Sequence, residues 1–263
     1  MPFTVITWNI YHGNIGPQTP AQRIQWIANI AALNSIDVVC LQEVPQSLLD
    51  TTVVDGPPGP LSGVMAALAD PSMNAFLNAY SVVQVYSENS TLGPQATTTA
   101  DGYLYLIRNA SVPIFNFTVP YQYDPAYFSS PYGTYYRPPV QLNVQTASGT
   151  QFLVMNWHAE TGPAAGISLD ILNARLGPAV HRPHVTIVAG DFNTRGDFAG
   201  VFYDGPNFRG WDNVVARYPS RTHGLQVWGL DHILVSANAT PILANTLDVT
   251  SDAYHFPVAA RIG

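Results

Sequence analysis

Apolar residues occur in short runs along the chain, and polar and turn-forming residues separate these runs. Short runs that are rich in β-branched and aromatic residues are typical of strands in a buried sheet. Such runs predict strands at about residues 3–9, 36–42, 81–87, 102–108, 138–146, 151–157, 184–190, 230–236, 241–248 and 256–261. Many strands with few long helices indicate a sheet-rich α/β protein.

Two segments have helical rather than strand-like spacing. Residues 20–33 carry an apolar face formed by Ile24, Ile27, Ile30 and Ala31. Thr19 followed by Pro20 is a typical helix start, because threonine caps free backbone N–H groups and proline fits the first turn. A second helix is expected near residues 165–177.

The chain shows no change of composition that would divide it, so we expect one domain over residues 1–263. No apolar run approaches the ~20 residues that a membrane-spanning helix needs, so we expect a soluble protein with no integral membrane segment. Residues 113–139 are rich in tyrosine and proline and predict an extended or looping excursion. Cys40 lies within an apolar run, which predicts a buried thiol.

The formal net charge is -7, which argues against the broad basic face that usually binds DNA. A metal site would account for part of this charge, because a bound cation reverses the local field. The basic residues are all arginine, and the sequence contains no lysine. Two explanations are open: a GC-rich coding sequence, or selection against ubiquitin-acceptor amines, as in lysine-poor toxin subunits that enter a host cytosol.

Polar residues recur where the predicted strands begin or end, which is where active sites are often built. The residues in these places are Asn9, Glu43, His158, Asp191, Asn193, Asp231, His232, Asp252 and His255. Any one of them alone is typical of a cap or a turn. Their recurrence indicates more, because phosphoryl transfer needs oxygen ligands for a cation, phosphate-binding groups and a paired histidine and carboxylate.

Six motifs in order resemble the motif set of the endonuclease/exonuclease/phosphatase superfamily, the group that includes deoxyribonuclease I. These motifs are Thr7-Trp-Asn-Ile, Leu41-Gln-Glu, Asn156-Trp-His-Ala, Gly190-Asp-Phe-Asn, Leu230-Asp-His-Ile, and Ser251-Asp followed by His255-Phe-Pro-Val. They extend over essentially the whole chain. The resemblance implies an α/β four-layer sandwich, in which two mixed β-sheets are flanked by helices and strand ends converge on the site.

The resemblance also implies a metal-dependent phosphodiesterase. Glu43 would be the chief metal ligand, assisted by Asn9 and by Asp252. Mg²⁺ is the expected occupant, with other divalent cations as alternatives, because the ligands are carboxylate and amide oxygens without a cysteine cluster.

The same resemblance implies roles for the remaining motif residues. Asp191 and Asn193 would orient the attacking water and hold the scissile phosphate. His158 would contact a phosphate oxygen and stabilise charge in the transition state. His255, held in one tautomer by Asp231, would transfer a proton.

Two further residues are candidates on weaker patterns. Arg137, just before the strand that leads to His158, resembles the arginine that nucleases of this family place against phosphate. A solvated loop arginine is the alternative. Asp101 resembles the acid that supports the first catalytic histidine, and Glu88 and Glu160 compete with it as partners of His158.

The last motif departs from the family pattern, in which its aspartate and histidine are adjacent. Here Ala253 and Tyr254 separate Asp252 from His255, which raises the question whether both residues reach the site. His232 follows Asp231 directly, and we expect it to point away from the site, because neighbouring strand residues face opposite sides.

Within the superfamily the chain is most similar to the nuclease subunit of cytolethal distending toxins. The segments that carry this likeness are the Gly/Ala-rich stretch after His158, Arg137-Pro-Pro and Arg221-Thr-His-Gly. It implies a secreted or host-delivered Mg²⁺-dependent deoxyribonuclease, with DNA as substrate and toxin delivery subunits as partners. The alternative is a phospholipid or phosphoinositide phosphoesterase, since aromatic loops at residues 121–136 would suit a lipid surface. The Asp252–His255 spacing keeps a third reading open, a binding protein with a decayed site.

Overall fold

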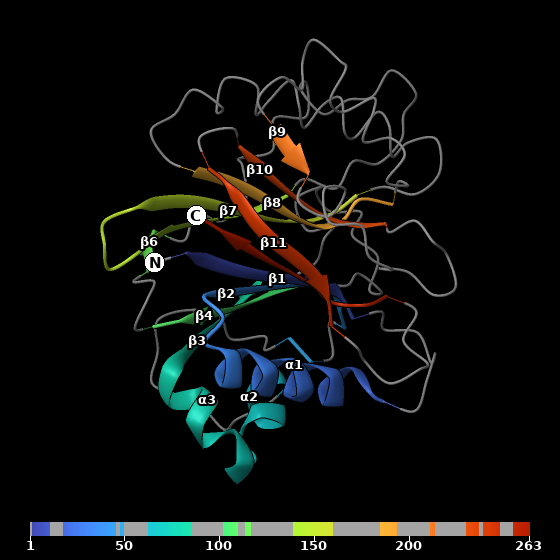
Figure 1. Ribbon diagram of the computed structural model, residues 1–263. Coiled ribbons are helices and arrows are strands. Elements are labelled where there is room, and N and C mark those ends of the chain that lie inside the picture. The colour runs from blue at the N-terminus through green and yellow to red at the C-terminus, as the bar shows by residue number, and fades with distance from the viewer. Residues whose placement is uncertain are drawn as a thin grey trace.

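The computed structural model consists of two six-stranded sheets that pack face to face, with helices outside one of them (Figure 1). It describes residues 2–10, 18–45, 48–49, 63–85, 102–109, 114–116, 139–159, 185–193, 211–213, 230–236, 239–247 and 255–263. The first sheet has the strand order β11-β12-β1-β2-β4-β3, and the second has β5-β6-β7-β8-β10-β9.

The strands of the first sheet are β1 (Phe3–Asn9), β2 (Val38–Val44), β3 (Tyr80–Val85), β4 (Gly102–Arg108), β11 (Pro241–Thr246) and β12 (Val258–Ile262). Those of the second are β5 (Ile114–Asn116), β6 (Val140–Gln145), β7 (Gln151–His158), β8 (Val185–Asp191), β9 (Trp211–Asn213) and β10 (Asp231–Ser236). The helices are α1 (Pro20–Asn34), α2 (Gly63–Leu68), a 3-10 turn (Pro71–Met73) and α3 (Asn74–Ala79).

Both sheets are mixed, as the family resemblance implies. β1 runs parallel to β2 and antiparallel to β12. β7 runs parallel to β8 and antiparallel to β6. Within each sheet, the carboxyl ends of the parallel pair therefore lie at one edge. A hydrogen bond between Asn9 at the end of β1 and Asp191 at the end of β8 brings these two edges together. The predicted α/β sandwich of two mixed sheets with flanking helices is confirmed.

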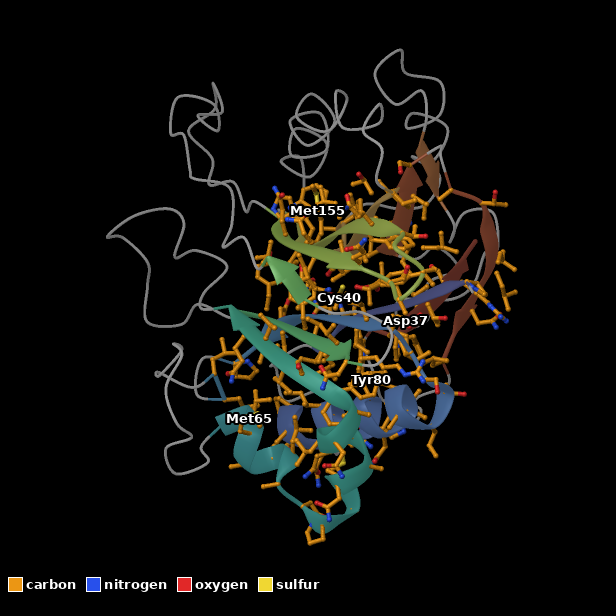
Figure 2. All side chains as sticks on the ribbon, turned by 90° about the vertical axis from the view of Figure 1, so that its left-hand side faces the viewer. Asp37, Cys40, Met65, Tyr80 and Met155 are labelled. Carbon is orange, nitrogen blue, oxygen red and sulfur yellow. The ribbon has the colours of Figure 1, made fainter. Side chains whose placement is uncertain are left out.

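Alternation along the strands builds two hydrophobic cores. In β1, Phe3 and Val5 face the second sheet and join the core between the sheets, whereas Ile6 and Trp8 face the helices and join a second core. Cys40 lies in the core between the sheets and is fully buried, as predicted (Figure 2).

Helix α1 begins where the sequence predicts. The Thr19 side chain accepts a hydrogen bond from the Gln22 N–H, and the Gln22 side chain accepts one from the Thr19 N–H, which completes a capping box. The helix ends at Ser35, whose backbone is left-handed. Its apolar face packs on the first sheet through buried residues that include Ile24 and Ile27.

The predicted strands all occur, and their ends agree with the prediction to within two residues. The pattern missed α2, α3, β5 and β9, because six-residue helices and three-residue strands are too short to show a period. β5 lies inside the predicted excursion at residues 113–139, and the remainder of that excursion, like the predicted helix at 165–177, falls outside the described residues. No helix in the described part of the chain is long and apolar enough to cross a membrane.

Candidate active site

The candidate site lies between the two sheets, where their inward-facing residues change from apolar to polar. On β7 the inward series is Phe152, Val154, Asn156 and His158, and on β8 it is Val185, Ile187, Ala189 and Asp191. The strand registers place His158 beside Asp191, and Asp191 beside Asp231 of β10. Strand alternation and register therefore bring three polar residues to one edge of the second sheet.

Asn9 of β1 connects the two sheets at this edge. Its side-chain Nδ2 donates hydrogen bonds to Oε1 of Glu43 and to Oδ2 of Asp191, both at 3.0 Å. His158 lies against the same pair, with Nε2 3.5 Å from Glu43 Oε1 and 3.8 Å from Asp191 Oδ2. Residues from β1, β2, β7 and β8 thus form one polar cluster.

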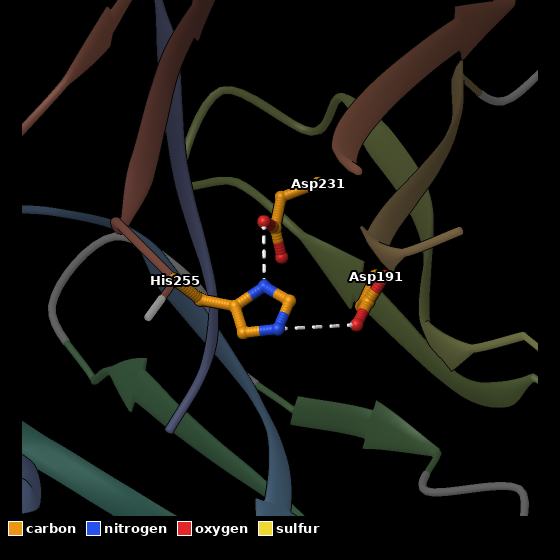
Figure 3. A group of neighbouring side chains, drawn as sticks. All are labelled: Asp191, Asp231 and His255. Atoms are coloured by element: carbon orange, nitrogen blue, oxygen red, sulfur yellow. Dashed lines mark hydrogen bonds and ion pairs between the residues drawn. The ribbon is translucent and has the colours of Figure 1, made fainter. Parts of the chain in front are cut away.

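The extra residues before His255 do not keep it out of the site (Figure 3). His255 Nδ1 lies 2.9 Å from Asp231 Oδ2, and Nε2 lies 3.7 Å from Asp191 Oδ2. Trp8 holds the backbone in this place, because its Nε1 donates to the His255 carbonyl oxygen at 3.0 Å. His255 therefore reaches the cluster despite the spacing, whereas Asp252 falls outside the described residues.

Glu43 reaches the cluster through an irregularity in β2. Regular alternation would place Glu43 on the helix-facing side with Leu41. Instead, Glu43 has a φ of 52°, and the pairing of β2 with β4 shifts between Leu41 and Val44. This bulge turns the carboxylate toward Asn9, and left-handed backbone at a non-glycine residue is a form of strain that gathers at functional sites.

Asn193 supports the end of β8. Its backbone N–H donates to Asp191 Oδ1 at 2.8 Å, and its side-chain Nδ2 donates to the Ala159 carbonyl oxygen at 2.8 Å. Its φ of 48° is left-handed, a conformation that asparagine tolerates better than most residues. Asn193 therefore fixes the orientation of the Asp191 carboxylate and ties the loop after β8 to the end of β7.

The remaining predicted site residues divide into two groups. Arg137, Asp252 and Asp101, with the competing partners Glu88 and Glu160, lie outside the described residues. His232 lies on the opposite side of β10 from Asp231, where its ring packs edge-on against Phe192 with 5.4 Å between ring centroids.

The groups of the cluster shift one another's pKa values. Burial lowers the pKa of His255, but the carboxylates of Asp231 and Asp191 outweigh burial and raise it to about 9. Burial raises the pKa of Asp231 to about 6, against the opposing effect of His255. Burial also disfavours ionised Asp191, yet the two imidazoles bring the pKa of this carboxyl below its ordinary value. Without metal, His255 is therefore protonated at neutral pH.

This arrangement predicts that the metal-free protein loses stability as the pH rises. The pKa of His255 is about 9 in the folded state and ~6.5 in an unfolded chain. The resulting stabilisation is fully present below ~6.5 and is lost as the pH rises through about 9. Urea unfolding in EDTA measures the free energy of unfolding at about pH 6 and about pH 9. Between these values the wild type should lose more of this free energy than His255→Gln does, by a few kcal/mol at most. Equal losses in the two proteins would contradict the predicted shift.

The residues of the cluster fit a hard divalent cation. Three carboxylates, from Glu43, Asp191 and Asp231, converge in a largely buried region, and carboxylate oxygens are the ligands that Mg²⁺ and Ca²⁺ prefer. Among the described residues, ligand atoms of Asp191, Asp231 and His255 lie within 4.8 Å of one another and could hold a metal. Because Asp231 already engages Nδ1 of His255, that pair is arranged for proton transfer, whereas Glu43, with Asn9 beside it, is arranged to hold the cation.

Sequence reasoning missed a second layer of polar residues below the cluster. Gln42 Nε2 donates to Asn156 Oδ1 at 2.6 Å, and Asn156 Nδ2 donates to the Leu41 carbonyl oxygen at 3.0 Å. Tyr103 and Tyr105 of β4 reach the backbone of β7. The available signal was phase, because each of these four side chains faces inward, in step with the apolar residues between the sheets.

Comparison with known proteins agrees with this geometry. The sequence profile of the endonuclease/exonuclease/phosphatase family matches residues 6–252. No curated protein matches the sequence. The fold is similar to that of many solved structures, three of which illustrate the range.

An endonuclease/exonuclease/phosphatase family protein from Leptotrichia buccalis C-1013-b superposes with a TM-score of 0.67 at 15% identity, covering 99% of both chains. D. rerio TDP2, complexed with a single-strand DNA product, gives 0.62 at 15% identity, with 100% of this chain and 99% of that chain covered. ANGEL2, a 2′,3′-cyclic phosphatase in complex with adenosine-2′,3′-vanadate, gives 0.63 at 14% identity, with 99% and 95% covered. At these identities the likeness concerns the fold.

Proposed function

Because the chain belongs to the endonuclease/exonuclease/phosphatase family, whose members are hydrolytic phosphoesterases and nucleases, we propose that it is a divalent-metal-dependent phosphodiesterase of nucleic acid. The observation that carries this proposal is the cluster itself. Asn9 joins Glu43 to Asp191, and Asp191 lies against both His158 and His255. One carboxylate thus connects the cation-binding side of the site to the proton-transfer side.

Each residue has a role that follows from its contacts. Glu43, with Asn9 beside it, would hold the cation, and Mg²⁺ suits these oxygen donors. The bound cation supplies Lewis-acid polarisation of a phosphate oxygen. Asp191 orients the attacking water, because Asn9 fixes one of its oxygens and the Asn193 N–H fixes the other.

The histidines act on the phosphate. Asp231 Oδ2 accepts from His255 Nδ1, so Nε2 is the atom of His255 that exchanges a proton at the reacting phosphate. His158 Nε2, 3.5 Å from Glu43 Oε1, donates to a phosphate oxygen as negative charge develops there. Asn193 Nδ2 donates one hydrogen to the Ala159 carbonyl oxygen and would hold the same phosphate through its second hydrogen. We retain Asp252 as a further metal ligand, Arg137 as a phosphate contact and Asp101 as a support of His158.

DNA is the substrate that we favour. The structural neighbour TDP2 was solved with a single-strand DNA product, and ANGEL2 with an adenosine vanadate, which is a nucleoside ligand. The motif likeness to the nuclease subunit of cytolethal distending toxins supports the same choice. Secretion, host delivery and toxin partner subunits stay predictions of that likeness.

A phospholipid or phosphoinositide phosphoester is the second candidate, because the net charge of -7 argues against the broad basic face that usually binds DNA. A panel of substrates at equal phosphoester concentration separates the two. With Mg²⁺ we expect hydrolysis of supercoiled plasmid and of single-stranded DNA, and none of sphingomyelin or phosphoinositide vesicles. EDTA should abolish all product. Release of product from the vesicles alone would reject DNA and leave the metal-dependent phosphoesterase in place.

A further inference from the structure

Within the described residues, the end of β7 extends beyond the last residue of β6 with which it pairs. Between β6 and β7 the pairing reaches Val140 and Asn156 at this end and goes no further within the described residues. On the other side β8 continues, and the Ala159 N–H donates to the Asp191 carbonyl oxygen at 2.8 Å. The N–H groups of Asn156 and His158 point to the side where pairing ends, because backbone groups alternate along a strand.

Two tyrosine hydroxyls from the opposite sheet accept hydrogen bonds from these N–H groups. Tyr105 Oη accepts a hydrogen bond from the Asn156 N–H at 3.0 Å and donates one to the Val140 carbonyl oxygen at 2.7 Å. It therefore bridges Val140 of β6 and Asn156 of β7. Tyr103 Oη accepts from the His158 N–H at 3.2 Å. The two hydroxyls hold successive inward-facing residues of β7, and the second of these carries the candidate catalytic imidazole.

The two tyrosines are suited to fix the distance between β4 and the end of β7. Both are buried in the core between the sheets, and both extend from β4, which is paired on its two sides with β2 and β3. A tyrosine ring has only two side-chain torsions, so a packed ring transmits position with little freedom. Burial raises the pKa of Tyr105 well above its ordinary value, which keeps its hydroxyl a donor.

The same end of β7 is tied to the strand that carries Glu43. The Asn156 side chain accepts from Gln42 Nε2 at 2.6 Å and donates to the Leu41 carbonyl oxygen at 3.0 Å. Gln42 and Glu43 are neighbours on β2, and β2 pairs directly with β4. The strand that bears Glu43 and the strand that bears His158 are therefore connected through β4 and through one amide pair.

We propose that Tyr103 and Tyr105 are positioning residues, whose buried hydroxyls hold the end of β7 and so set where the His158 imidazole lies relative to Glu43. This inference rests on the proposed function, because the placement of the imidazole matters for catalysis only if the cluster is the active site. The holding of the strand itself does not depend on any activity. Loss of a hydroxyl that merely filled the core would affect stability. It would change neither the hydrogen exchange of the β7 amides nor the rate at which bound substrate reacts.

The test compares Tyr103→Phe and Tyr105→Phe with Tyr80→Phe as a matched control. Tyr80 is also a buried tyrosine of the first sheet, but its hydroxyl lies 2.7 Å from the carbonyl oxygens of Ala31 and Ile36, beside helix α1. Each variant removes one buried hydroxyl and keeps the ring. Amide hydrogen exchange resolved by NMR, melting temperature, and kcat and KM with single-stranded DNA and Mg²⁺ are measured for all four proteins.

We expect faster exchange of the His158 amide in Tyr103→Phe and of the Asn156 amide in Tyr105→Phe, and neither change in Tyr80→Phe. We expect all three variants to melt a few degrees lower than the wild type. Only the first two should lose kcat, by about tenfold with KM unchanged, because misplaced catalytic groups slow the bound complex. Unchanged β7 amides, or a kcat equal to that of Tyr80→Phe, would overturn the inference. If the wild type hydrolyses no substrate, the proposed function fails, and the amide exchange alone decides whether the hydroxyls hold β7.

Discussion

Replacing His255 by glutamine should lower kcat by about a thousandfold while leaving the fold intact. Glutamine keeps a polar side chain of similar reach but cannot exchange a proton with the reacting phosphate. The fall should appear in kcat rather than in KM, because the lost interaction belongs to the transition state. Asp231→Asn should give a comparable fall, since asparagine can no longer fix the tautomer that its 2.9 Å contact with Nδ1 selects.

The chain offers a matched control in His232→Gln. His232 follows Asp231 on β10 and is also buried, but its ring packs on Phe192, away from the cluster. Its replacement should lower stability modestly and leave kcat within about twofold of the wild type. Steady-state kinetics on DNA and urea unfolding separate the two kinds of effect. Similar kcat values for His255→Gln and His232→Gln would reject His255 as the proton-transfer residue.

The second large effect is expected at Gly190. A Cβ atom on this residue would lie 1.7 Å from the backbone oxygen of Trp157, on the strand beside it. Neither backbone can move aside without shifting β7 and β8, which carry His158 and Asp191. Gly190→Ala should therefore lower the free energy of unfolding by more than ~3 kcal/mol, beyond ordinary overpacking, and abolish activity.

Gly149→Ala is the control for this substitution. Gly149 lies in the turn between β6 and β7 with a φ of 88°, and its nearest neighbour to a new Cβ is a Gln145 side-chain nitrogen at 3.7 Å. The cost there is backbone strain of about 1 kcal/mol, far from the cluster. Urea unfolding of both variants tests the difference. A Gly190→Ala protein as stable as Gly149→Ala would show that β7 and β8 are not packed as closely as described.

Much of the fold follows from the spacing of apolar residues. The run from Phe3 to Trp8 is buried on both faces, one against the second sheet and one against the helices, so it reads as a strand from sequence alone. Helix α1 is predictable because its cap and its apolar face agree. The helices α2 and α3 are not, since six residues give too few turns to show a period.

The sequence predicts the site only in part, and the reason lies in the local structure around each residue. His158 and Asp191 continue the inward series of their strands, so position and phase together identify them. Glu43 does not follow the alternation of β2, and only the left-handed backbone at that residue turns its side chain inward. Tyr103 and Tyr105 are predicted as core packing, because nothing in the local sequence shows that their hydroxyls accept from the N–H groups of β7.

The central claim is that the cluster between the sheets hydrolyses a nucleic-acid phosphodiester with a divalent cation. Cleavage of end-labelled single-stranded DNA tests it most directly, with wild type and His158→Ala measured in Mg²⁺ and in EDTA. The account predicts product only from the wild type with Mg²⁺. Cleavage that persists in EDTA, cleavage of equal rate by His158→Ala, or no cleavage by the wild type with Mg²⁺ would contradict it.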